Sequence, residues 1–259
     1  MAASIRIFFS EGSGGTVERE GPALNVDLSS LEAHYHERGK RHVKGMARFL
    51  EFWESEGAAL MAPRARMALM TAAEAEEAFG PEVLRHLSGA AFLTLSVWTL
   101  GIDLERRSGE LMSSEGAVMQ GFLLDVAGSI ALYTMHNVLL DWMEREFQAI
   151  GKVLTGEFYP GLGGVDAALM EKIASRLGTR DTIGVEARSV SMLHPRKTQC
   201  SFVGAVAGTA QSSRVVIEPK PCVPCQGERC LYHQLGGCHM ALVKGLRGGS
   251  RLSEADAKP

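Results

Sequence analysis

The sequence predicts a soluble globular protein in which helices and short strands are mixed. Hydrophobic residues make up 46% of the 259 residues and charged residues 22%, an ordinary balance for a soluble fold. Apolar runs of strand length occur at 5–9, 92–98 and 215–217. Longer segments, above all 118–153, repeat their apolar residues at helical spacing instead. The length suits one large domain or two small ones.

The charge and the start of the chain narrow the possible partners and the compartment. A formal net charge of -3 argues against general binding to nucleic acid or to an anionic membrane. The first residues lack the basic start and the long apolar run of a signal peptide. We therefore expect a cytoplasmic protein. In that reducing compartment, cysteines are more commonly metal or cluster ligands than disulfide partners.

Changes in composition predict four parts, namely a leader segment that packs on the main domain (1–62), the main domain (63–221), a cysteine-rich loop (222–244) and a flexible tail (245–259). In the leader segment, the strand at 5–9 ends in a glycine-rich turn, and 31–53 has helical spacing. The first half of that helix is strongly basic. Such a stripe is either a solvated helix face or a docking surface for an acidic partner or a phosphate.

The main domain contains the longest apolar segment, 118–153. Polar residues such as Asp125 and His136 interrupt its apolar stripe, which disfavours a membrane span, and we predict a long core helix. His136 is either a satisfied histidine at the edge of the core or a ligand.

The second half of the main domain is predicted to alternate loop, helix and strands. Residues 155–164 are rich in glycine, which predicts a loop whose backbone N–H groups can approach a ligand closely. A helix capped by Asp166 should follow, running to about residue 177. We expect the next strand to begin at 183–185, and 189–208 to be rich in strands with a bend at Pro195.

Four of the five cysteines lie close together near the end of the chain, at Cys222, Cys225, Cys230 and Cys238. Four thiolates on a short loop can close a tetrahedral zinc site or hold an iron–sulfur cluster, for example [4Fe–4S]. His233 or His239 could replace Cys238 as the fourth ligand. The alternative is a tight thiol pair, Cys222 and Cys225, with two bystanders.

The order of several motifs resembles the activation domain of vitamin B12-dependent methionine synthase, and most of all its stand-alone bacterial homologues. The similar segments, spread over about 63–240, are Leu-Asp125-Val-Ala-Gly-Ser-Ile, Phe158-Tyr-Pro160-Gly161-Leu-Gly163, Ile183-Gly184-Val185 and Met192-Leu-His-Pro195-Arg-Lys-Thr198. The Cys-x2-Cys-x4-Cys spacing is also found at the end of many stand-alone homologues.

The resemblance implies an α+β fold with a twisted, mostly antiparallel sheet flanked by helices. In methionine synthase this domain binds S-adenosylmethionine and docks on a cobalamin domain. After cob(I)alamin is oxidised, an electron reduces cob(II)alamin and S-adenosylmethionine remethylates it. The implied partners here are therefore a corrinoid protein or cobalamin-dependent methyltransferase, which supplies the cobalamin, and an electron donor.

The residues at the implied ligand loop depart from the family's Arg-x-x-Pro-Gly-Tyr pattern. Pro160, Gly161 and Gly163 are kept, but Glu157 occupies the arginine position and Leu162 the tyrosine position. The family arginine pairs with the ligand's carboxylate. Glutamate there exchanges a charge-assisted hydrogen bond, worth about 1.5–3 kcal/mol, for repulsion.

A second family tyrosine is also replaced. It lies four residues before the proline that matches Pro195, and the residue here is Ser191. These replacements argue against S-adenosylmethionine binding in the family manner, while the fold is expected to persist.

Two functions follow from the sequence. In the first, the chain docks on a corrinoid protein and supports its reductive reactivation through an iron–sulfur cluster. In the second, it is a non-catalytic assembly or regulatory module with a structural metal site and no S-adenosylmethionine binding. A brown colour that bleaches on reduction would indicate the cluster, and zinc released to a chelator would indicate the structural site.

Overall fold

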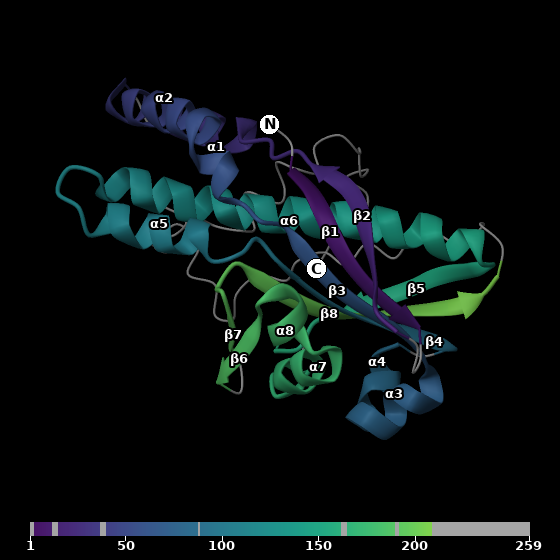
Figure 1. The fold of residues 1–259 in the computed structure, drawn as a ribbon. Coiled ribbons are helices and arrows are strands. Elements are labelled where there is room, and N and C mark those ends of the chain that lie inside the picture. Colours follow the sequence, from purple (N-terminus) through teal and green to yellow (C-terminus); the bar gives the residue numbers. More distant parts are fainter. Residues whose placement is uncertain are drawn as a thin grey trace, which may run out of the picture.

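Six strands form one twisted sheet at the centre of the computed structural model, which describes residues 3–11, 15–36, 40–87, 89–161, 165–189 and 192–208 (Figure 1). In spatial order the strands are β2 (Val17–Leu24), β1 (Ala3–Glu11), β3 (Arg64–Thr71), β4 (Phe92–Thr99), β8 (Thr198–Ala207) and β5 (Lys152–Phe158). Only β1 and β3 are parallel, and every other neighbouring pair in this sheet is antiparallel. The predicted α+β class with a mostly antiparallel sheet flanked by helices is confirmed.

Helices cover both faces of the sheet (Figure 1). One face, called the α6 face below, packs against α1 (Ser29–His36), α2 (Lys40–Ser55), the short 3-10 helix η1 (Gly57–Leu60), α5 (Asp103–Met112) and α6 (Val118–Ala149). The opposite face, called the α7 face, packs against α3 (Ala72–Phe79), α4 (Glu82–His86), α7 (Leu169–Leu177), α8 (Thr179–Ile183) and the hairpin of β6 (Glu186–Ser189) and β7 (Met192–His194).

Strand β4 shows why the sheet has two cores. Side chains alternate across a strand, so Trp98 enters the core of the α6 face while Leu95 and Val97 enter the core of the α7 face. Both faces of this central strand are buried, which explains the continuous apolar run that predicted it.

The leader segment contributes to the same sheet and core. The predicted strand at 5–9 is part of β1, and Ile5 and Ile7 are fully buried. The helix predicted at 31–53 is two helices, α1 and α2, instead of one. The predicted strand at 215–217 and the cysteine-rich loop lie outside the described residues.

Helix α6 is the long core helix that the apolar stripe predicted. Within the described part of the chain, it is the one helix long and apolar enough to cross a membrane, and 56% of its most apolar window is buried inside the protein. Helix α5 packs closely beside it: the Ser108 hydroxyl donates to the Gly121 carbonyl over 2.9 Å, and a Cβ at Gly121 would lie 2.7 Å from the Ser108 carbonyl oxygen. Only glycine allows this approach.

Two local predictions were wrong, and a glycine is involved in each. Residues 155–158 are not loop but the end of β5, where Gly156 lies opposite Gly204 of β8 beside a bulge. Glycine in a strand marks such bulges and close contacts, here with Thr155 Oγ1 2.6 Å from a Cβ built on Gly204. Residue 183 ends α8 and does not begin a strand, because Gly184 adopts a left-handed conformation (φ +72°) that terminates the helix.

Candidate functional site

A cavity of about 470 Å³ opens on the α7 face of the sheet, which is a usual size for a small-molecule site. Three segments line it. They are the loop after β5 (Tyr159, Pro160, Gly161), the start of α7 and the turn before it (Ala167, Met170), and the stretch from β7 into β8 (Met192, Leu193, Arg196, Thr198, Gln199, Cys200).

The β5–β8 pairing brings the first and third segments together. Phe158 lies opposite Phe202 in the register, so the loop leaving β5 begins beside the strand that carries Cys200. Gly161 then turns the loop, with φ +81° and an N–H donated to the Val165 carbonyl over 3.0 Å. A side chain at Gly161 would also meet the Met170 methyl group at 3.2 Å. Of the residues predicted for the ligand loop, Pro160 and Gly161 line this cavity.

Pro195 is buried and is not one of the cavity-lining residues, although Leu193 and Arg196, close to it in the sequence, are. Leu162, Gly163 and Ser191 lie outside the described residues. Cys200 lies on a buried part of β8, and this burial raises the pKa of its thiol to about 12. The thiol in the cavity wall is therefore neutral at pH 7.

Glu157 is turned toward helix α6 and is not one of the cavity-lining residues. Its Oε2 lies 2.8 Å from His136 Nε2 and accepts a hydrogen bond from the Tyr159 hydroxyl over 2.8 Å. The Tyr159 hydroxyl also lies 2.9 Å from His136 Nε2. The His136 ring stacks on Trp98 with 5.3 Å between ring centres. The three residues Glu157, His136 and Tyr159, called the triad below, join β5, its following loop and α6.

The triad is a feature that sequence reasoning missed. Residues 157 and 159 are two positions apart and so share a side of an extended chain, which is a signal visible in the sequence. His136 lies on a different element, and nothing in the sequence assigns it to the same site. The side chain of His136 is only 15% exposed, so it lies at the edge of the core.

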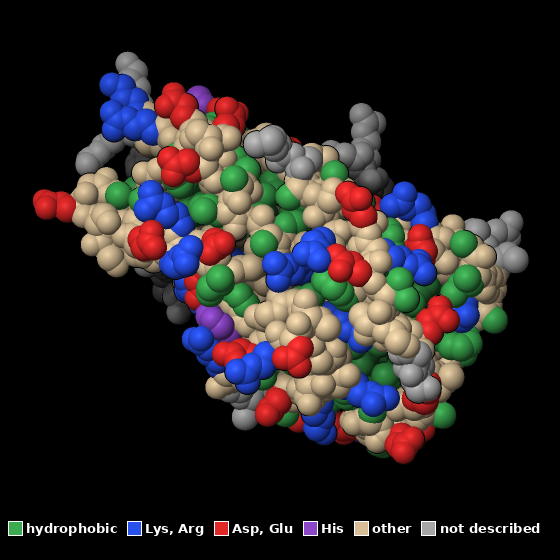
Figure 2. All heavy atoms as spheres, viewed as in Figure 1, with side chains coloured by type: hydrophobic (Ala, Val, Ile, Leu, Met, Phe, Trp, Pro, Cys, Tyr) green, Lys and Arg blue, Asp and Glu red, His purple; other side chains and the backbone are tan. Residues whose placement is uncertain are grey.

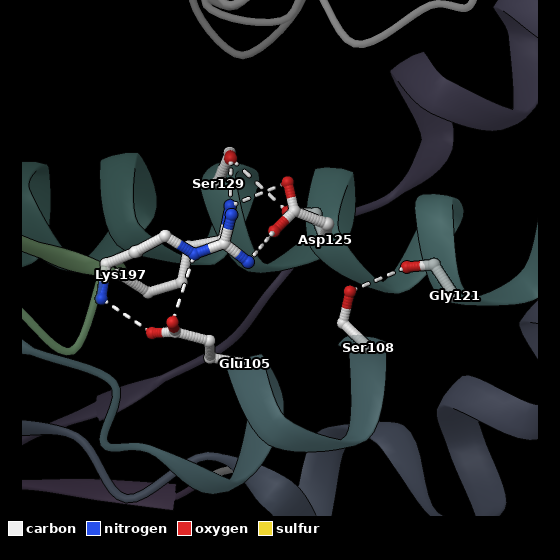
Figure 3. A network of polar contacts seen from close by, with 7 residues as sticks. Glu105, Ser108, Gly121, Asp125, Ser129 and Lys197 are labelled. Carbon is white, nitrogen blue, oxygen red and sulfur yellow. Dashed lines mark hydrogen bonds and ion pairs between the residues drawn. The ribbon is translucent and has the colours of Figure 1, made fainter. Parts of the chain in front are cut away.

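A second polar cluster connects the residues just before β8 to helices α5 and α6 (Figure 3). Lys197 Nζ lies 3.0 Å from Asp125 Oδ2 and donates to Ser129 Oγ over 2.8 Å, both on α6. Arg196 donates its Nε to Glu105 of α5 over 3.0 Å. Burial lowers the pKa of Lys197 because it disfavours the ammonium form, and Asp125 opposes that effect.

This cluster joins two of the motifs that carry the resemblance. Asp125 belongs to the first motif and Lys197 to the last, and the ion pair between them connects segments separated by seventy-two positions in the sequence, 197 − 125 = 72. The carboxylates of Glu105 and Asp125 balance the charges of Arg196 and Lys197 in this cluster. Arg196 Nη2 also lies 3.8 Å from Asp125 Oδ1. The motifs thus have a structural role in holding the cavity wall against α5 and α6.

The described residues contain no group of three or more His, Cys, Asp or Glu side chains that could hold a metal ion. Cys222, Cys225, Cys230 and Cys238 all lie beyond residue 208, outside the described part of the chain. On the face seen in Figure 2, acidic and basic side chains are interspersed. No protein-family model matches the chain, and no curated protein matches its sequence.

Proposed function

We propose that this chain is a cytoplasmic accessory protein of a cobalamin-dependent methyltransferase system. It docks on a corrinoid protein and supports the reductive reactivation of that protein through an iron–sulfur cluster. The observation that supports this function best is the convergence of two motifs. The segment 158–161 and the segment 192–200 are far apart in the sequence, yet both line one cavity of a size that suits a small molecule.

The cysteine-rich loop would carry the redox chemistry. Cys222, Cys225, Cys230 and Cys238 supply four soft thiolate ligands, which fit a [4Fe–4S] cluster and also fit zinc. A bound cluster supplies one electron at a time, and cluster potentials extend to the low values that reduction of cob(II)alamin to cob(I)alamin requires. A separate electron donor must then restore the electron.

The non-catalytic alternative is favoured by one specific observation, the position of Glu157. By the resemblance, Glu157 occupies the position of the family arginine that pairs with the carboxylate of S-adenosylmethionine, and in the structure it is bonded to His136 and Tyr159. Under this alternative the cysteines hold a structural zinc or an inert cluster, and the chain acts as an assembly or regulatory module that does not bind S-adenosylmethionine.

Metal analysis after anaerobic purification separates the two functions. The reactivation function predicts iron and acid-labile sulfide, a visible absorbance that bleaches with dithionite, and transfer of an electron from the reduced chain to the cob(II)alamin of a corrinoid protein. Zinc without sulfide, in a colourless protein, would contradict it.

Alanine variants define the ligand set. Cys222→Ala, Cys225→Ala and Cys230→Ala should each lose the metal centre, because each leaves an open coordination position. Cys238→Ala should lose most of it, unless His233 or His239 completes the site. Cys200→Ala is the matched control, since Cys200 is buried in β8. If Cys200→Ala loses the centre while Cys238→Ala keeps it, this ligand set is wrong.

A further inference from the structure

We propose that the cavity on the α7 face is a binding site for a small, uncharged, planar aromatic molecule. This inference goes beyond the proposed function, because it does not depend on the cysteine-rich loop or on a corrinoid partner. It depends on the surfaces that line the cavity, on the balance of charge around it and on the direction in which Glu157 points.

The residues that line the cavity are mostly apolar. Tyr159 and Pro160 come from the loop after β5, and Met170 and Met192 come from α7 and β7. Methionine side chains adapt to the shape of a ligand, and their sulfur atoms make favourable contacts with aromatic rings. Met192 is 54% exposed, so the cavity reaches the surface beside it. These surfaces suit an aromatic ring.

The triad holds Tyr159 in place. Its hydroxyl donates to Glu157 and lies beside His136, so this polar group is already used within the protein. A lining residue fixed in this way loses little further freedom when a ligand binds, which favours affinity. The same bonds keep the negative charge of Glu157 on the side of α6.

Charged groups in the cavity wall are already neutralised. Arg196 is the one charged side chain among the described lining residues, and it is paired with Glu105 and close to Asp125. The Cys200 thiol keeps its proton because burial raises its pKa to about 12. An anionic ligand would have to compete with Glu105 for Arg196 and would also lose hydration, which is costly, whereas an uncharged ligand avoids that loss.

A polar side chain on β8 can orient such a ligand. Thr198 already donates its hydroxyl to Thr99 over 2.8 Å, which leaves the Thr198 oxygen able to accept. A small number of polar groups in an apolar cavity gives orientation and specificity to binding. A ring that carries one hydrogen-bonding group fits this arrangement.

A pair of fluorescent probes tests the proposal on the full chain. N-phenyl-1-naphthylamine is uncharged, and 1-anilinonaphthalene-8-sulfonate has the same ring system with an added sulfonate. We expect the uncharged probe to bind at least tenfold more tightly than the sulfonate. Met170→Trp should weaken binding of the uncharged probe by tenfold or more, because the larger side chain fills the cavity.

Met119→Trp is the matched control. Met119 is 42% exposed on α6 and does not line the cavity, so the same substitution there should leave the affinity unchanged. Circular dichroism should confirm that both variants are folded. The proposal is overturned if the uncharged probe fails to bind, if Met170→Trp binds it as well as the wild type, or if the sulfonate binds equally well.

S-adenosylmethionine serves as a competitor in the same assay. No displacement of the uncharged probe is expected, because this ligand carries both a carboxylate and a sulfonium charge. Displacement at comparable concentrations would overturn the proposal and show that the cavity accepts a charged ligand. None of these results depends on metal content, so failure of this proposal and failure of the proposed function are distinguishable.

Discussion

The two faces of the sheet carry different sites. On the α6 face, polar side chains are buried and paired with one another, as in the triad and in the Lys197–Asp125 ion pair. On the α7 face, the packing leaves a cavity lined mainly by apolar groups and by a neutral thiol. Polar contacts also hold α7 on its face, where Arg66 Nε donates to the Leu177 carbonyl over 3.0 Å, so the difference lies in the room that the α7 face leaves for a ligand.

Removing one member of the Lys197–Asp125 pair should have the largest effect on stability. In Asp125→Ala, the ammonium of Lys197, a residue only 8% exposed, would be left without its carboxylate partner. Because Asp125 is itself partly exposed, we expect a loss of about 2–4 kcal/mol in the free energy of unfolding, measured with urea. The control is Asp103→Ala, which breaks an exposed pair with Arg106 and should cost at most about 1 kcal/mol. Equal losses in the two variants would show that burial does not make the Lys197–Asp125 pair more important for stability than an exposed pair.

The close approach of α5 and α6 is tested by a pair of glycine variants. A Cβ at Gly121 would lie 2.7 Å from backbone atoms of α5, so Gly121→Ala should destabilise the protein by about 1–3 kcal/mol. Gly109 on α5 has open space around it, and Gly109→Ala should be neutral or stabilising by up to about 1 kcal/mol. Thermal unfolding of both variants measures the difference. A stable Gly121→Ala would mean that the helices can separate without cost.

The neutral thiol on the α7 face predicts a pH dependence. Burial raises the pKa of Cys200 from 9.0 to about 12, so between these values the unfolded chain has lost a proton that the folded chain keeps. The unfolded state then binds fewer protons, and stability falls as the pH rises through this window, by about 1.4 kcal/mol per pH unit. Cys200→Ala lacks this dependence.

Between about pH 8 and about pH 10, the free energy of unfolding of the wild type should therefore fall by about 1.4 kcal/mol more than that of Cys200→Ala. Urea titrations at the two pH values measure it. A difference that does not vary with pH would place the thiol in contact with water.

Tyr159 connects the two sites, since it is one of the cavity-lining residues and its hydroxyl belongs to the triad. Tyr159→Phe should cost the least of these changes, about 0.5–1.5 kcal/mol, because it removes one hydrogen bond and keeps the ring. A double-mutant cycle with Glu157→Gln should show that the two effects are not additive. Strict additivity would mean that the hydroxyl and the carboxylate do not interact in solution.

Elements with a strong period were predictable from the sequence. The alternation at 5–9 predicted β1, the apolar run at 92–98 predicted β4, and the apolar stripe from 118 predicted α6. Strands and helices that pack against a core repeat their apolar residues at different spacings, so the spacing identifies the element. Strand β5 was missed because Gly156 belongs to the glycine-rich stretch 155–164, which is typical of a loop. The role of Gly156 appears only when it is paired with Gly204.

The metal-binding potential of the cysteine-rich loop is likewise visible in the sequence alone. Its four thiols lie within seventeen positions (238 − 222 + 1 = 17), so they can reach one metal or cluster in any fold that lets the loop close. The partners of Glu157 were decided by the tertiary structure. The motif assigns it to a ligand loop, whereas the fold lays α6 against β5 and places His136 within 2.8 Å of its carboxylate. A buried carboxylate must find a hydrogen-bond donor, and which donor it finds depends on how distant elements pack.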